Sequence, residues 1–208
     1  QYCSMSVHES QSRLWENSIG KSKHFWGRFF PELRNSCGLD VELDEFYKII
    51  NRVEPSFIRT EADELTYNLH IILRFEIELG LIEGKTSFDD LPRIWNEKFR
   101  EYLGIVPPND SLGVLQDIHW SWGNIGYFPT YTLGSMIAAQ LFAAAQKDIP
   151  DLVHTIGEGK FAELRNWLNE NIWRHGKKYL TKELIRRATG KDPSPDDYLE
   201  YLENKYAG

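Results

Sequence analysis

"SMIAAQLFAAAQ", residues 135–146, is apolar on almost every side of a helix. A helix without a polar face has to be covered by other parts of the chain. The stretch therefore predicts a buried helix and, with it, a helical fold.

Helical patterns with capping residues occupy most of the remaining chain. The first is residues 2–30, one or two helices that we expect Pro31 to interrupt. Two segments lack the helical period: residues 53–58 favour an extended backbone, and residues 116–134 favour a structured loop or short strand. The predicted fold is mainly α with a few short extended segments, its other helices covering residues 44–52, 60–79, 87–104, 161–174, 181–189 and 195–206.

The composition limits the function classes. A length of 208 residues suffices for one sizeable domain, and a net charge of −7 offers no basic footprint for nucleic acid. No apolar run approaches the length of a membrane span, so we expect no membrane partner. Cys3 and Cys37 are the only cysteines, which predicts a reducing, cytoplasmic location without a disulfide framework.

His8 and Glu9 look like half of an H-E-x-x-H zinc motif, but Ser12 stands where the second histidine would be. In a helix, Glu9 and Arg13 lie one turn apart and can form an ion pair on a solvated face. The alternative is that Glu9 is a carboxylate metal ligand, with Arg13 or His8 as its outer partner. Taken alone, this stretch favours the ion pair.

Arg59 immediately precedes a predicted helix whose first turn is acidic. One interpretation makes it the partner of those acids, which are Glu61, Asp63 and Glu64. The other uses the guanidinium to bind a free carboxylate through two parallel hydrogen bonds. The spacing does not choose between them.

An aromatic segment carries the third candidate group. Asp117 and His119 alternate within it, and Tyr127 and Tyr131 follow. An imidazole and two phenols on an ordered loop are suitable donors to an oxyanion. They are equally suitable as packing groups with polar ends. These residues do not form a complete catalytic set, and H-E-x-x-H occurs nowhere in the chain.

Together these stretches resemble a known family, the thermostable, Taq-type zinc metallocarboxypeptidases. The likeness rests on H-E-S-x-S-R at residues 8–13, I-R-x-x-A-D at 58–63, and G-x-x-Q-D-x-H-W at 113–120, followed by "GYFPTYTLG" at 126–134. The resemblance implies that Glu9 is the third zinc ligand and that Arg59 anchors the C-terminal carboxylate of a peptide. It implies that His119 and Tyr131, with Tyr127 as a weaker candidate, bind substrate and stabilise the oxyanion.

The resemblance also implies a helical zincin-like fold, of which residues 1–208 are a single C-terminal portion. Members of the family are longer, and their H-E-x-x-H segment, with two zinc-binding histidines and the general-base glutamate, lies upstream of Gln1. We therefore expect zinc, or cobalt, in the complete enzyme, and neither tight zinc binding nor hydrolysis by this chain alone. The expected partners are peptides with a free C-terminus and a second copy in a homodimer.

Two alternatives remain. The chain could be a helical module that binds a peptide carboxylate without chemistry, or part of a related zinc oligopeptidase that cleaves internally. Dependence of the complete enzyme on Arg59 for a free C-terminus separates exopeptidase from oligopeptidase.

Overall fold

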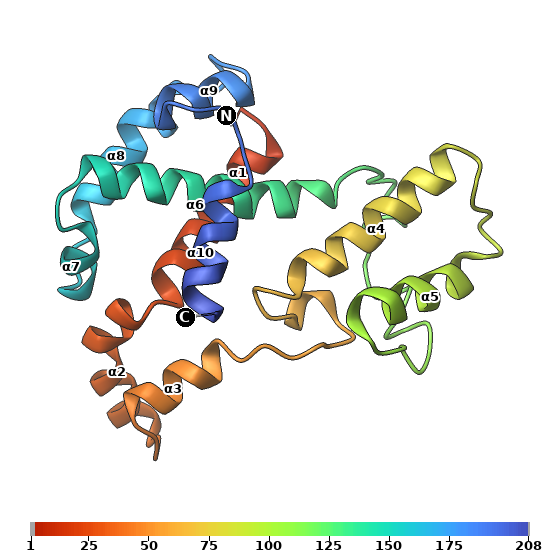
Figure 1. Cartoon of the computed structure of the whole chain (residues 1–208), viewed down its shortest axis with the longest axis horizontal. Coiled ribbons are helices and arrows are strands. Elements are labelled where there is room, and N and C mark those ends of the chain that lie inside the picture. The colour runs from red at the N-terminus through yellow and green to blue at the C-terminus, as the bar shows by residue number, and fades with distance from the viewer. Residues whose placement is uncertain (1–2, 208) are drawn as a thin grey trace. The chain divides into compact units, whose positions relative to one another are not determined.

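The computed structural model describes residues 3–207, and the chain divides into two compact units. Unit 1 comprises Gln1–Asn51 and Leu133–Gly208, and unit 2 comprises Arg52–Thr132. Every regular element within residues 3–207 is helical, which confirms the predicted mainly α fold (Figure 1). Residues 53–58, predicted to be extended, form an irregular segment that pairs with no strand in the described chain.

Unit 1 packs around the predicted buried helix. That helix is α6 (Pro129–Asp148), which starts six residues earlier than the apolar run and whose first four residues are counted in unit 2. Proline is well suited to a first helical turn because its missing N–H would have no intrahelical partner there. The core also draws on η1 (Leu14–Gly20), α7 (Leu152–Gly157), α8 (Ala162–Asn171) and α9 (Thr181–Thr189). The sequence patterns did not predict α7.

The start of unit 1 holds two helical stretches, as predicted, the first of which changes from α- to π-helical without a break. It contains α1 (Met5–Arg13), the π-helical η1, and α2 (Lys23–Cys37). Pro31 does not interrupt the helix but lies inside α2. Both Pro31 and Gly27, the residue one turn before it, are exposed, so the carbonyl that loses its helical hydrogen bond faces water. Unit 1 is completed by α3 (Leu43–Ile50), η3 (Trp173–His175) and α10 (Asp196–Tyr206).

In unit 2 the first long helix starts later than predicted. Thr60 is not its N-cap: it lies in the short 3₁₀ helix η2 (Arg59–Glu61), and α4 runs over Tyr67–Ile82. The Asp63 carboxylate accepts hydrogen bonds from the backbone N–H groups of Leu65 and Thr66, both at 2.9 Å. Asp63 therefore makes the local turn that precedes α4, and Gly80, predicted as the stop, lies within the helix.

The second helix of unit 2 ends where predicted, but Ser87 is not its N-cap: the helix starts at Leu91, with Asp90 at the N-cap position, because Ser87 and Asp90 form a turn before it. α5 covers Leu91–Leu103, with Ser87 and Asp90 bonded to each other before it and Gly104 in the left-handed conformation after it. Its Trp95 and Phe99 are buried in one cluster with residues of α4. Residues 104–128 then form turns, bends and irregular backbone. The loop predicted for residues 116–134 is therefore present only up to residue 128, and residues 129–134 belong to α6 instead. Among the described helices, none has the length and apolar character needed to cross a membrane.

Candidate functional site

Glu9 is held on α1 by a neighbour one turn along the helix. Ser4 caps α1 by accepting a hydrogen bond from the Val7 N–H. Arg13 then donates from Nε to Glu9 Oε1 at 3.0 Å, and the two side chains are 15% and 22% exposed. The predicted pair is therefore present in unit 1. It orients the carboxylate without removing it from solvent.

A carboxylate held by a guanidinium fits the pattern of a metal ligand with an outer partner. A zinc site, however, needs three or four protein ligands. Within residues 3–207, no three His, Cys, Asp or Glu side chains converge in a way that could hold a metal. Glu9 thus fits as one ligand, and the described residues do not supply the rest of a set.

In unit 2, Arg59 is bound to a partner far away in the sequence. Its Nε and Nη2 both donate to Asp117 Oδ1, at 3.1 and 2.7 Å, and its Nη1 donates to the Tyr67 hydroxyl at 2.9 Å. Arg59 is only 6% exposed. The interpretation of Arg59 as the partner of the nearby helix-turn acids is therefore wrong, because η2 and the Asp63 turn direct the guanidinium to Asp117 instead.

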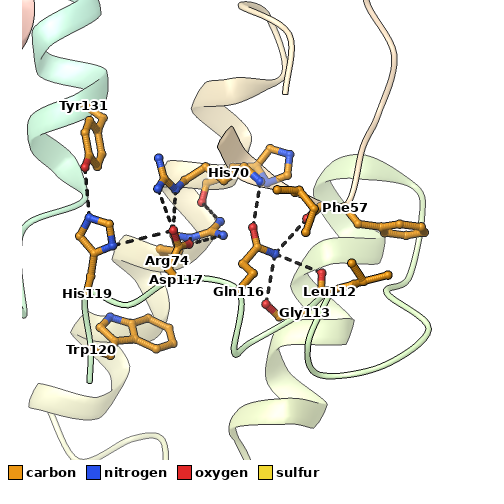
Figure 2. A network of polar contacts seen from close by, with 12 residues as sticks. Phe57, His70, Arg74, Leu112, Gly113, Gln116, Asp117, His119, Trp120 and Tyr131 are labelled. Carbon is orange, nitrogen blue, oxygen red and sulfur yellow. Dashed lines mark hydrogen bonds and ion pairs between the residues drawn. The ribbon is translucent and has the colours of Figure 1, made fainter. Parts of the chain in front are cut away.

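The second oxygen of Asp117 binds another arginine. Arg74, on α4, is fully buried, and its Nε and Nη2 both lie 2.7 Å from Asp117 Oδ2 (Figure 2). Its Nη1 donates to the backbone oxygen of His70. Burial opposes the charge on Asp117, but the hydrogen bonds and charges of Arg59 and Arg74 outweigh it and lower the pKa of the carboxyl. Burial lowers the pKa of Arg74 to about 10, so it stays charged at neutral pH. Two cations thus share one anion.

Gln116 ties this loop to the backbone beside Arg59. Its Oε1 accepts from the Arg59 N–H at 2.8 Å. Its Nε2 lies 2.9 Å from the oxygen of Phe57 and 3.1 Å from those of Leu112 and Gly113 (Figure 2). The amide therefore fixes the backbone on both sides, and with it the direction in which the Arg59 side chain leaves the chain.

His119 lies at the other side of Asp117. Its Nε2 is 3.1 Å from the Tyr131 hydroxyl, and its Nδ1 is 3.8 Å from Asp117 Oδ1 (Figure 2). Burial and the charges of Arg59 and Arg74 lower the pKa of His119, although Asp117 opposes them. The imidazole is therefore neutral at pH 7.

The predicted tyrosines surround the same imidazole. The ring of Tyr127 lies 5.3 Å from that of His119 and 5.5 Å from that of Tyr131, between ring centres. The Arg59 guanidinium carbon is 5.0 Å from the centre of the Tyr131 ring. Unit 2 thus brings together Arg59, His119, Tyr127 and Tyr131. Glu9 belongs to unit 1.

Glu78, a buried carboxylate that the sequence patterns did not single out, anchors the aromatic segment. Glu78 on α4 is 2% exposed and accepts hydrogen bonds from Trp120 Nε1 at 2.8 Å and from the Gly126 N–H at 3.1 Å. Burial raises the pKa of Glu78. Arg74, also missed, precedes it by one turn. The sequence did offer a signal for both residues: Arg74 and Glu78 are opposite charges four residues apart in a helix that is otherwise mostly apolar.

Comparison with known proteins extends over nearly the whole chain. Residues 1–206 match the family described as carboxypeptidase Taq (M32) metallopeptidase. The chain is 48% identical to thermostable carboxypeptidase 1 of Thermus thermophilus and 44% identical to carboxypeptidase 1 of Bacillus subtilis, in each case over 98% of this chain and 40% or 41% of the relative. It spans about 40% of the length of the curated relatives that it matches.

A solved structure shows the same helical architecture. Trypanosoma cruzi metallocarboxypeptidase 1 matches with a TM-score of 0.96 and 40% identity, covering 100% of this chain and 44% of that one. The family match, the relatives and the shared fold agree. This chain belongs to the carboxypeptidase Taq (M32) metallopeptidase family.

Proposed function

We propose that this chain is the C-terminal portion of a zinc-dependent metallocarboxypeptidase that removes C-terminal residues from peptides. The observation that carries the proposal is the cluster in which Arg59 and Arg74 share the single carboxylate of Asp117 beside His119. Two cations and one anion leave one positive charge in a largely buried setting. Such a setting favours an anionic ligand, and the free carboxylate of a peptide is the anion that an exopeptidase has to recognise.

In this proposal Arg59 anchors the substrate carboxylate. A guanidinium has five N–H donors, and Arg59 commits three of them to Asp117 and Tyr67. The remaining two are sufficient for a charge-assisted contact with a carboxylate. Asp117 and Gln116 keep the group oriented before substrate arrives, which reduces the entropic cost of binding.

His119 and Tyr131 are proposed to stabilise the oxyanion. Their mutual hydrogen bond, together with a neutral imidazole, gives a pair that can donate a hydrogen bond without adding charge. Prearranged donors of this kind stabilise negative charge as it develops. Tyr127, packed against His119, is the weaker candidate for the same task.

Glu9 is proposed as one zinc ligand, with Arg13 orienting its carboxylate. A zinc ion, when bound, would polarise the scissile carbonyl and acidify a water. The other ligands and the general base have to come from residues outside this chain, so we expect the chain alone to bind zinc weakly and to hydrolyse nothing. A homodimer and the use of cobalt remain predictions that rest on the resemblance, and a cytoplasmic location remains a prediction that rests on the low cysteine content.

Metal content and activity test the assignment together. We expect the chain, after dialysis, to retain no stoichiometric zinc and to leave a blocked dipeptide intact. The complete enzyme should retain one zinc and release the C-terminal amino acid. One tightly held zinc and peptide hydrolysis by residues 1–208 alone would overturn the assignment of Glu9 as a ligand that depends on outside partners.

Recognition of the substrate carboxylate by Arg59 is tested with matched peptides that end in a free C-terminal carboxylate or in an amide. In the complete enzyme, Arg59→Ala should reduce the preference for the free acid by roughly 10- to 100-fold, as expected for a lost charge-assisted pair. The ratio of the two rates cancels any general loss of folded protein. Arg93→Ala, which removes an exposed arginine of unit 2, is the control. An unchanged ratio in Arg59→Ala would favour the internally cleaving oligopeptidase.

The non-catalytic alternative has its own outcome. A binding module would bind the free-acid peptide in preference to the amide, yet the complete protein would release no amino acid even when supplied with zinc. This alternative needs a test because no three potential metal ligands converge within residues 3–207.

A further inference from the structure

Gly134 occupies an unusual position for a glycine, inside the long helix α6. Glycine weakens a helix interior because it loses more backbone freedom on folding than alanine does. Gly134 is nevertheless buried within a helix rich in alanine. Some feature of the fold has to offset this cost.

That feature is the close approach of Glu9. A Cβ atom at position 134 would lie 2.7 Å from Glu9 Cγ, 2.8 Å from Glu9 Cβ and 3.3 Å from the Glu9 carbonyl carbon. Separations this short are not tolerated between carbon atoms, and two of the three belong to the base of the side chain and the backbone, which cannot swing away. The hydrogen of Gly134 is therefore what allows α1 and α6 to meet at Glu9 within unit 1.

The other α-helical glycines of unit 1 do not share this contact. A Cβ at Gly27 in α2 would have no neighbour within 4 Å, and one at Gly157 in α7 would be 3.6 Å from the nearest atom. Among these glycines, the close contact is thus particular to Gly134, where α6 passes Glu9; we call this contact the seat of Glu9. Gly27 provides a matched position at which alanine meets no obstacle.

Two contacts then define where the Glu9 carboxylate lies. The α6 backbone at Gly134 packs against the Cβ and Cγ atoms, and Arg13 Nε holds Oε1 at 3.0 Å. With the stem and one oxygen fixed in this way, the direction of Oε2 is set before any ligand arrives. A metal ligand has to be placed to within a few tenths of an ångström, so a rigid seat is directly useful for binding.

We propose that Gly134 is a positioning residue for the metal-binding carboxylate of Glu9. The proposal rests on the proposed function, in which Glu9 is a zinc ligand. Gly134 touches neither metal nor substrate and acts only by letting Glu9 lie where it does. Residues that orient a ligand commonly change metal affinity by about 10- to 100-fold when substituted.

The test measures zinc affinity in the complete enzyme by competition with a chelator, with thermal unfolding of the metal-free protein recorded in parallel. Gly134→Ala should weaken zinc binding by about 10- to 100-fold. Gly27→Ala should leave zinc affinity unchanged and should not lower the unfolding temperature. Once Glu9→Ala has removed the carboxylate, adding Gly134→Ala should cause little further loss of zinc affinity, because the two residues act through one group.

A second variant covers the case in which Gly134→Ala does not fold. Glu9→Asp keeps the charge and leaves α6 intact but withdraws the carboxylate by one methylene. If the position is set by the seat, Glu9→Asp should weaken zinc binding by at least about 10-fold. Unchanged zinc affinity in Glu9→Asp would overturn the proposal.

The outcomes distinguish the role of Gly134 from the assignment of Glu9 as a zinc ligand, on which it rests. If Glu9→Ala leaves zinc affinity intact, Glu9 is no ligand and the proposed function fails together with the inference. If Glu9→Ala abolishes tight binding while folded Gly134→Ala binds zinc as well as Gly27→Ala does, the ligand assignment stands and the role of Gly134 is refuted.

Discussion

The two carboxylates at the centre of the proposed function are held in opposite ways. Glu9 in unit 1 is 22% exposed and pairs with an arginine four residues away on the same helix. Asp117 in unit 2 pairs with Arg59 and Arg74, 58 and 43 residues away, the second of which is fully buried. Glu9 keeps an oxygen available and depends on its seat, whereas Asp117 is committed on both oxygens. The difference suits a ligand in one case and a structural anchor in the other.

Among the substitutions considered, neutralising Asp117 should have the largest effect on the stability of the chain. Asp117→Asn leaves the buried Arg74 without a charged partner, and breaking a buried ion pair from one side typically costs about 3–5 kcal/mol. The free energy of unfolding of the chain, measured with urea, should fall by that amount at pH 7. The folded pKa of Asp117 lies below 3.8, so its contribution is present above pH 3.8 and is lost as the pH falls through the folded value. The difference in the free energy of unfolding between wild type and Asp117→Asn should therefore shrink in strong acid.

A surface pair in the same unit is the control for that experiment. Glu97 bonds with Arg93 on α5, and each side chain is 59% exposed. Glu97→Gln should cause no resolvable loss, because water and salt screen exposed pairs. An Asp117→Asn effect no larger than that of Glu97→Gln would show that the buried network does not stabilise unit 2.

Glu78 should give a smaller loss and the opposite pH dependence. Glu78→Gln replaces an acceptor of two hydrogen bonds by an amide whose NH₂ group has to face a donor, which costs about 1–3 kcal/mol at a buried site. Because the folded pKa of Glu78 is raised above 4.5, the folded protein binds this proton more readily than the unfolded chain does. Wild type should therefore gain stability relative to Glu78→Gln as the pH falls from 7 towards 4.5.

Urea denaturation at several pH values separates the two carboxylates. The wild-type advantage over Asp117→Asn is lost on acidification, and the advantage over Glu78→Gln grows. If both differences changed in the same direction, at least one of the two directions of pKa shift would be wrong.

The charge of Arg59 should be visible at His119. Arg59→Gln removes one of the two cations that lower the pKa of His119, while Arg74 keeps its contact with Asp117. An NMR titration of the chain should show the His119 pKa below 6.5 in wild type and higher in Arg59→Gln. Arg93→Gln should leave it in place. His70, whose pKa burial and Arg74 lower to about 3, serves as an internal reference that stays neutral throughout the titration.

The same contrast explains how much of the molecule could be predicted from the sequence. Local signals succeeded: the Glu9–Arg13 spacing, the Gly104 boundary of α5 and the apolar run in α6 each depend on residues a few positions apart. The motif resemblance supplied the family. Those features are set by helical geometry, which a single sequence displays directly.

Features that depend on distant contacts could not be predicted. In the sequence, Asp117 alternates with His119, and no neighbouring residue indicates a contact with Arg59 or Arg74. The start of α4 was misplaced because Asp63 bonds to the backbone two and three residues ahead, an alternative that competes with a helix cap. Pro31 was misjudged because its tolerance depends on exposure, which is a property of the fold.

The smallest effect concerns the pair on α1. Arg13→Gln removes the charge that meets Glu9 Oε1 and keeps most of the side-chain length. Arg13 also pairs with Glu16, at 3.3 Å, and each partly exposed pair about one helical turn apart contributes about 0.5 kcal/mol or less, so the free energy of unfolding of the chain should change by no more than about 1 kcal/mol. The loss should disappear at high salt, where exposed pairs are screened. A loss comparable with that of Asp117→Asn would remove the contrast between the two carboxylates, because it would mean that Glu9 also depends on its arginine as a buried structural anchor does.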